Sequence, residues 1–203
     1  MNRVWKKRKW FIVCMLIGAA VTVTAVLFLR LRGSVAVKPG RVSLPPGEVS
    51  AYHQDDVAWA QDLLGKSRFT MESSGCLVTC IASAVSTETD KAVTPGALNT
   101  VFSEKNVYDS AGNIQWAAVD AIDGLTAVVC PDAAQADIDA WLAAGHYPIV
   151  RVRMHGLGSF HYVLIVGIED GAYLCMDPLK SGLTSLSDYQ NRVYAVRVVH
   201  CDS

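Results

Sequence analysis

The chain has 203 residues, 51% of them hydrophobic, which is enough for one substantial folded domain and an additional segment. The formal net charge of −1 is unevenly distributed, because residues 1–32 carry 7 Lys and Arg and no acidic residue, whereas residues 33–203 carry 11 Lys and Arg and 19 Asp and Glu. Residues 33–203 therefore have a net charge of about −8, and a nucleic-acid partner is not expected.

Residues 10–29 (WFIVCMLIGAAVTVTAVLFL) are expected to form a membrane-spanning helix. They contain no charged side chain over 20 positions, the length that a helix needs to cross a bilayer. Residues 1–9 carry five cations, against two directly after the span, Arg30 and Arg32. This difference predicts a single-pass protein of the cell membrane with residues 1–9 in the cytoplasm and the C-terminal domain outside. A cleaved signal peptide is the alternative, although its apolar region usually has only about 7–15 residues.

The part of the chain after the span is expected to consist of a linker and one domain. Residues 30–50 contain Gly, Pro and Ser with little apolar periodicity, which predicts an extended linker. The folded domain is then expected over residues 51–203.

Within this domain, helical patterns come before strand patterns. Helices are predicted over residues 55–64, 76–85, 94–104, 114–121 and 134–144. Strands are predicted over residues 125–130, 147–154, 160–168, 172–176 and 192–199. Helices followed by strands predict an α+β domain in which a helical part covers an antiparallel sheet.

Cys76 is a candidate nucleophile. It follows Ser73-Ser74-Gly75, with both serines as candidate helix caps, and it opens an apolar run. Its sulfur is therefore expected near unpaired N–H groups and the positive end of a helix dipole. Both features favour a thiolate, which is the attacking form of a cysteine, and the free amides could stabilise an oxyanion. A buried structural cysteine is the alternative interpretation of Cys76 taken alone.

His161 and Asp177 are expected to meet across a hairpin. Glu169-Asp170-Gly171 is a turn signal between two apolar runs, which places His161 opposite residue 177 or 178. Asp177 can then orient the imidazole, while the other ring nitrogen faces the Cys76 sulfur. A register slip of one residue would put the two side chains on opposite faces. The three residues together predict the Cys-His-Asp triad of a thiol hydrolase.

Gly75-Cys76, the strand HYVLIVGI and the turn Met176-Asp177-Pro178 resemble the double-glycine leader peptidase-like family of papain-like cysteine peptidases, most closely its stand-alone, membrane-anchored bacterial branch. Supporting matches are Gln54, Asp55, Trp59, Trp116, residues 94–99 and residues 142–150. The resemblance spans residues 51–198. It implies a papain-like fold, a Cys76 nucleophile, His161 as base and then acid, Asp177 as the orienting group, and peptide or cell-envelope substrates.

The resemblance includes one departure at the oxyanion site. Exporter peptidases of this family place an oxyanion glutamine a few residues before the cysteine, where this chain has Thr-Met-Glu-Ser-Ser at residues 70–74. Gln54 is the candidate donor by its place in the stand-alone branch, and backbone amides are the alternative. A lost oxyanion donor costs on the order of a hundredfold or more in rate.

Other functions were weighed against the peptidase. A catalytically inactive papain-like domain that binds peptides or cell-envelope components is the main alternative. Cys76 and Cys80 could share a helix face, but no second Cys/His pair with ligand spacing accompanies them, so neither metal nor cofactor is expected. Thiol transfer is disfavoured because the chain has no Cys-x-x-Cys. The five cysteines outside the span allow disulfides or small buried thiols.

Overall fold

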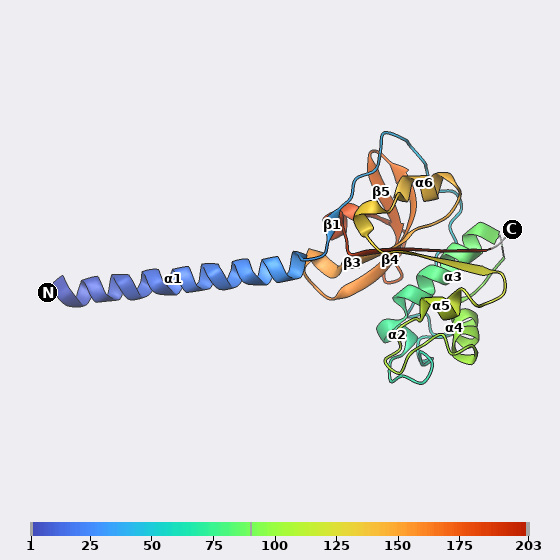
Figure 1. Cartoon of the computed structure of the whole chain (residues 1–203), viewed down its shortest axis with the longest axis horizontal. Helices are drawn as coiled ribbons and strands as arrows, with labels where there is room; N and C mark the ends of the chain where they lie inside the picture. Colours follow the sequence, from blue (N-terminus) through green and yellow to red (C-terminus); the bar gives the residue numbers. More distant parts are fainter. Residues whose placement is uncertain (1, 90, 202–203) are drawn as a thin grey trace. The chain divides into compact units, whose positions relative to one another are not determined.

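A computed structural model describes residues 2–89 and 91–201 (Figure 1). The chain divides into two compact units, residues 1–33 and residues 34–203. The first unit contains the helix α1 (Asn2–Leu31), and every other helix and strand belongs to the second.

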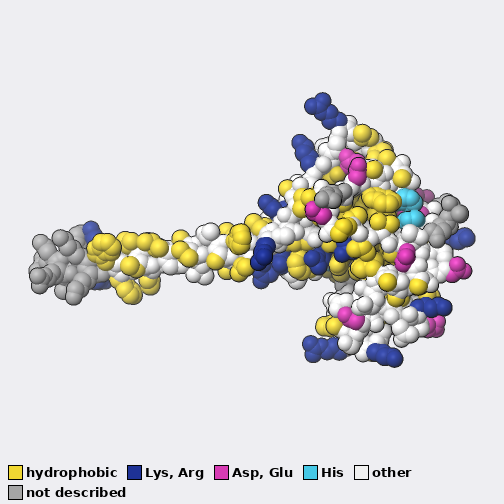
Figure 2. Space-filling model, viewed as in Figure 1, with side chains coloured by type: hydrophobic (Ala, Val, Ile, Leu, Met, Phe, Trp, Pro, Cys, Tyr) yellow, Lys and Arg dark blue, Asp and Glu magenta, His cyan; other side chains and the backbone are white. Residues whose placement is uncertain are grey.

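Helix α1 has the properties expected of a membrane span. Its residues 8–31 are long and apolar enough to cross a bilayer, and none of that segment is buried against protein. Figure 2 shows hydrophobic side chains along this helix. Its polar side chains satisfy themselves within the helix, because the Thr22 and Thr24 hydroxyls donate to carbonyl oxygens one turn earlier, each at 2.9 Å. The expected spanning helix is thus present, in agreement with single-pass anchoring.

The second unit is an α+β domain around one antiparallel sheet. The sheet has six strands in the order β2-β8-β3-β4-β5-β6. Their bounds are β2 (Leu125–Cys130), β8 (Ala195–Cys201), β3 (Ile149–Arg153), β4 (Phe160–Glu169), β5 (Ala172–Met176) and β6 (Leu183–Ser185). A separate two-stranded pair joins β1 (Val35–Ala36) to β7 (Arg192–Val193). The α+β class and the antiparallel sheet are confirmed.

Helical segments cover both faces of the six-stranded sheet. The α-helices of the domain are α2 (Met71–Ser74), α3 (Cys76–Thr89), α4 (Pro95–Glu104), α5 (Trp116–Val119) and α6 (Ile138–Ala143). The 3₁₀ helices are η1 (Ala133–Gln135), η2 (Met154–Gly156) and η3 (Leu186–Tyr189). Strand alternation sends Leu164 into a core with Ile81 of α3, and the next residue, Ile165, into a second core with Ile138 of α6 and Leu186 of η3. The sheet is therefore buried on both sides, whereas one helical layer was predicted.

The predicted helix over residues 55–64 is wrong. This segment forms successive turns. The Asp56 side chain accepts from the Ala58 N–H at 2.9 Å, which is the local side-chain bond that competes with helix formation. Leu63 then pairs with Thr70 in an isolated bridge, so the chain folds back on itself where a helix would continue straight.

Residues 34–50 belong to the folded domain, although the sequence places them in a linker. Val35 pairs with Val193, Leu44 forms a bridge with Ile168, and the Ser50 N–H donates to the Thr87 hydroxyl at 3.1 Å. We call residues 34–50 the strap. Only residues 32 and 33 remain between the end of helix α1 and the domain unit.

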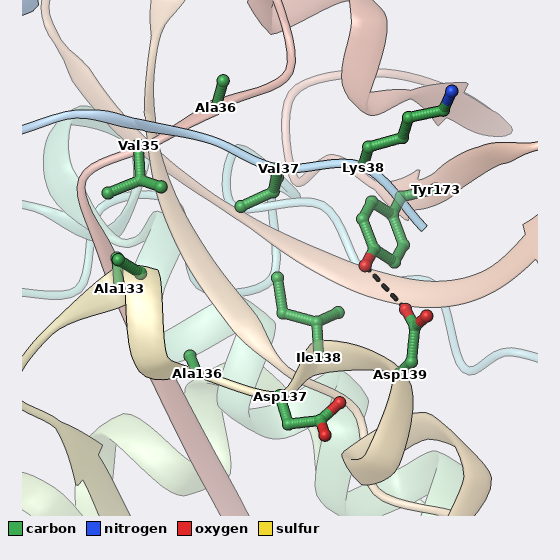
Figure 3. Close-up of a pocket in the computed structure, with 11 residues that line it drawn as sticks. Val35, Ala36, Val37, Lys38, Ala133, Ala136, Asp137, Ile138, Asp139 and Tyr173 are labelled. Carbon is green, nitrogen blue, oxygen red and sulfur yellow. Dashed lines mark hydrogen bonds between the residues drawn. The ribbon is translucent and has the colours of Figure 1, made fainter. Parts of the chain in front are cut away.

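Asp139 of α6 connects the strap to the sheet. Its Oδ2 accepts from the Gly40 N–H at 2.7 Å, and its Oδ1 accepts from the Tyr173 hydroxyl at 2.6 Å. Figure 3 shows the second bond at the edge of a pocket of about 430 Å³, which strap residues 35–38 line on one side. The carboxylate thus links three segments that are far apart in the sequence.

Asp139→Ala is expected to lower the free energy of unfolding of the domain by about 1–3 kcal/mol, because it removes two hydrogen bonds to an ionised group. It should also make the strap cleavable by protease before the domain unfolds. Tyr173→Phe is the matched control, since it removes one of the two bonds and should cost about half as much. Urea unfolding and limited proteolysis of the full chain measure both effects. Unchanged strap protection in Asp139→Ala would contradict the linking role.

Candidate active site

Cys76 is the first residue of α3, directly after a tight junction between two helices. The preceding helix α2 is capped by Thr70, whose hydroxyl accepts from the Ser73 N–H at 3.3 Å. The two serines expected to cap α3 are instead the last residues of α2, and Gly75 alone separates the helices. The Thr79 N–H donates to the Gly75 carbonyl at 2.9 Å, which starts the helical ladder of α3. The N–H groups of residues 76–78 come before it in the first turn, at the positive end of the helix dipole.

Gly75 is required at this junction by close packing. A Cβ atom there would lie 2.5 Å from the Met71 carbonyl oxygen and 2.8 Å from the Met71 Cα, which are backbone atoms that cannot move aside. Gly75→Ala is therefore expected to destabilise the domain by about 1–3 kcal/mol and to displace Cys76. Thermal unfolding and the alkylation rate of Cys76 measure the two effects, with Ser74→Ala as the neighbouring control. A Gly75→Ala protein as stable as the wild type would contradict the close packing.

His161, near the start of β4, connects the other two candidate residues. Its side chain is buried, with 4% of its surface exposed, and its Nε2 lies 2.6 Å from Asp177 Oδ1. Cys76 lies close enough to the imidazole to raise its pKa. Because Asp177 occupies Nε2, Nδ1 is the ring nitrogen left for the sulfur. The structure thus brings Cys76, His161 and Asp177 together in that order.

Asp177 is held from several directions after the end of β5. Its Oδ1 accepts from the Leu179 N–H at 2.9 Å as well as from His161, and its Oδ2 accepts from the Tyr189 hydroxyl of η3. Lys180 Nζ lies 3.9 Å from Oδ2. Sequence reasoning missed Tyr189 and Lys180. Lys180 could have been found from its place three residues after Asp177, but no local signal marks Tyr189.

The electrostatics of the pair favour the charged form of both groups. Burial alone would lower the pKa of His161, but the hydrogen bond to Asp177 and the interaction with Cys76 outweigh it and raise that pKa to about 9. Burial alone would raise the pKa of Asp177, but the hydrogen bonds from His161 and Tyr189 outweigh it and hold that pKa below its usual value. At neutral pH His161 is therefore expected to be an imidazolium.

His161 and Asp177 are in contact, as predicted, but their strands pair in a different register from the predicted one. Leu164 pairs with Met176, and an irregularity between Ile165 and Gly167 shifts the pairing by one residue. If the pairing of Leu164 with Met176 continued away from the turn, residue 179 would lie opposite His161. The sequence predicts residue 177 or 178 at that position. Asp177 is instead a diagonal neighbour on the same face, because alternate residues of a strand point to the same side.

Gln54 lies between the segment before Cys76 and the turn after Asp177. It is buried, its side-chain Nε2 donates to the Glu72 carbonyl at 2.6 Å, and its backbone N–H donates to the Pro178 carbonyl at 3.1 Å. A carbonyl acceptor at Glu72 requires the amide NH₂ there, which determines the orientation of the amide. One of the two amide hydrogens is thereby used, and the other stays available. The role of Gln54 as oxyanion donor remains a prediction.

Cys76 opens onto a cleft of about 430 Å³. Its apolar walls come from Phe69, Leu77, Ile114 and Trp116, and its polar walls include Tyr162, Arg151 and Arg197. Cys80, one turn further along α3, does not line this cleft. Its thiol is buried and donates to the Tyr162 carbonyl at 3.5 Å, and burial raises its pKa well above the usual value. Cys76 is therefore the accessible thiol of the pair.

Metal binding and disulfide formation, the other roles considered for cysteine and histidine, find no support in the geometry of the described residues. Among the described residues, no group of three or more His, Cys, Asp or Glu side chains is arranged to hold a metal ion. Cys76, Cys80, Cys130 and Cys175 form no disulfide, which agrees with the alternative that several cysteines are small buried side chains.

Comparison with known proteins gives no family assignment. No model of a known protein family matches this chain. No curated protein matches it either.

Proposed function

We propose that this chain is a membrane-anchored, extracytoplasmic cysteine peptidase with a papain-like domain. Cys76, His161 and Asp177 would hydrolyse an amide bond in a peptide or cell-envelope substrate. The observation that supports this most strongly is the buried hydrogen bond between Asp177 and His161, together with the interaction of that imidazole with Cys76, a thiol that lines a cleft. A structural histidine needs neither an ionised partner nor an open thiol beside it.

The proposed reaction follows from the charges and donors around Cys76. The Cys76 thiolate attacks the carbonyl carbon of the scissile amide, and the resulting oxyanion is stabilised by N–H groups at the start of α3 and by Gln54. His161, protonated at Nδ1, gives this proton to the departing amine, which leaves a thioester on Cys76. His161 then takes a proton from water as the water attacks the thioester, and the acid product is released. Asp177 keeps the imidazole oriented through Nε2 in both steps.

The proposal also includes an orientation of the chain in the membrane. The spanning helix is preceded by a basic segment, and loops rich in Lys and Arg stay in the cytoplasm. The domain, with its net charge of about −8, would then face the outside of the cell. Proteolysis of intact cells, with a tag on either end of the chain, tests this orientation.

One observation favours the second candidate function, a domain that binds peptides without cutting them. Gln54 already donates one amide hydrogen to the Glu72 carbonyl, so the oxyanion would depend on the remaining hydrogen and on backbone amides. Binding through the cleft needs no oxyanion donor, whereas turnover does.

The reactivity of Cys76 separates the two functions. We expect iodoacetamide at neutral pH to alkylate Cys76 at least about tenfold faster than Cys130, the half-buried thiol whose pKa is raised by burial. Peptide mass spectrometry resolves the two sites in the full chain in detergent. Fast labelling together with cleavage of a mixed peptide library would support the peptidase. Slow labelling of Cys76 in the folded protein would rule it out.

A further inference from the structure

Two arginines lie in the cleft that Cys76 lines. Arg151 is on β3 and Arg197 is on the adjacent strand β8. Arg151 pairs with Ala195, and Arg197 pairs with Ile149, so the two arginines are diagonal neighbours. Diagonal neighbours two residues out of register point to the same face of a sheet. Both guanidinium groups are therefore presented to one cleft by rigid central strands.

Neither arginine has an anionic partner among the described residues. No ion pair within residues 8–89 and 91–201 includes Arg151 or Arg197. The Nε atoms of both are buried and form no hydrogen bond in that part of the chain. Arg197 Nη1 donates only to backbone carbonyls, at 2.7 Å to Val196 and at 3.3 Å to Cys130. Burial lowers the pKa of Arg197, and the charge of Arg151 lowers it further.

This pair of like charges is unusual for its surroundings. Residues 33–203 are acidic overall, so the two arginines are not part of a generally basic surface. Holding two cations together in a partly buried place is costly unless an anion joins them. The free protein therefore carries unsatisfied positive charge at this position.

Aromatic rings hold both guanidinium groups in place. The Arg197 guanidinium lies 5.5 Å from the centre of the Trp116 ring, and that of Arg151 lies 4.3 Å from the centre of the Phe160 ring. Tyr162, which also lines the cleft, lies close enough to Arg151 for the charge of the arginine to act on its pKa. Such contacts restrict a guanidinium plane, which is the feature that suits arginine to a flat carboxylate. The pair is preorganised for that ligand.

We propose that Arg151 and Arg197 form a subsite that binds a carboxylate of the substrate peptide beside Cys76. This inference rests on the proposed function for the cleavage that follows, but not for the binding itself. The carboxylate can come from an Asp or Glu side chain or from the C-terminus of the peptide, since both present the same group. Leu77 and Trp116, which also line the cleft, contact the apolar remainder of the peptide.

Calorimetric titration of the full-length Cys76→Ala protein in detergent tests the binding without cleavage. Two peptide pairs serve as probes: acetyl-Ala-Glu-Ala-amide against its Gln counterpart, and acetyl-Ala-Ala-Ala acid against its amide. The carboxylate member of at least one pair is expected to bind at least about tenfold more tightly at low salt, and the pair that responds identifies the source of the carboxylate. Equal affinities within both pairs, or no binding by any of the four peptides, would overturn the subsite.

Arginine variants locate the effect. Arg151→Gln and Arg197→Gln should each remove most of the difference within the responding pair, while Arg151→Lys and Arg197→Lys should restore part of it. Arg41→Gln is the control for the loss of one arginine, because Arg41 is exposed on the strap and does not line the cleft. Unfolding temperatures show whether each variant is folded. A preference that survives in both folded Gln variants would overturn the assignment to these arginines.

The test of the carboxylate subsite can succeed or fail independently of the test of the peptidase activity. A preference for carboxylate peptides together with an unreactive Cys76 would retain the subsite and remove the peptidase. A reactive Cys76 with no preference within either pair would do the reverse.

Discussion

Replacing Cys76 by alanine is expected to reduce peptide hydrolysis to the uncatalysed level, a loss of at least about 10⁴-fold in kcat/KM. The substitution removes the only atom proposed to form a covalent bond to the substrate, while the cleft and its two arginines stay in place. Cleavage of a mixed peptide library by the full chain in detergent, followed by mass spectrometry, gives the rates.

Cys80→Ala is the matched control for this experiment. Cys80 lies on the same helix but is fully buried, so its replacement should leave turnover within about threefold while costing some stability. His161→Ala should match Cys76→Ala, and the double variant should lose no more than either alone, because residues that act as a unit are not additive. Full turnover by Cys76→Ala would show that the nucleophile is misassigned.

The local signals in the sequence were enough to predict several elements. The strand over residues 125–130 has the predicted bounds. The helix after Thr94 begins as predicted, because the Thr94 hydroxyl accepts from the Ala97 N–H at 3.2 Å and Pro95 occupies the first turn. Both signals act within one turn or one strand, so they do not depend on the rest of the fold.

Features that depend on distant segments could not be predicted. The strap has no apolar periodicity, and its position follows from single contacts such as Leu44 with Ile168 and Gly40 with Asp139. The segment 55–64 has helical spacing, but the Asp56 side chain and the Leu63–Thr70 bridge favour turns. Contacts between distant segments therefore decide the position of the strap, whereas a local side-chain bond and a short-range bridge outweigh helical propensity in residues 55–64.

The contacts of the candidate site also divide into a local one that could be predicted and distant ones that could not. The meeting of His161 with Asp177 could be predicted because a short turn joins their strands and both side chains point to one face. The partners of Asp177 beyond that hairpin could not be predicted, because Tyr189 reaches the carboxylate from η3, past a further strand. The arginine pair likewise appears only when β3 and β8, which are far apart in the sequence, become neighbours.

Asp177→Asn is expected to lower kcat/KM by about 10²–10⁴-fold while preserving the fold. Asparagine has nearly the same shape and can still accept from the Leu179 N–H, but it carries no charge to stabilise the imidazolium. Tyr189→Phe is the matched control, because it removes one hydrogen bond to Asp177 and keeps the carboxylate. Its loss should stay within about tenfold.

The pH dependence of kcat/KM should distinguish a charge effect from a loss of structure. His161 has a pKa raised to about 9, so the imidazolium that protonates the leaving amine is present below this pH and is lost above it. In Asp177→Asn, burial still lowers this pKa and only the interaction with Cys76 opposes it, so the alkaline fall in rate should move from about 9 toward the ordinary value of 6.5. In Tyr189→Phe the fall should stay near 9. Rates measured between about pH 5 and pH 10 test both shifts. An alkaline fall that stays near 9 in Asp177→Asn would mean that Asp177 does not maintain the charge on His161, and any loss of rate would then reflect misplacement of the imidazole.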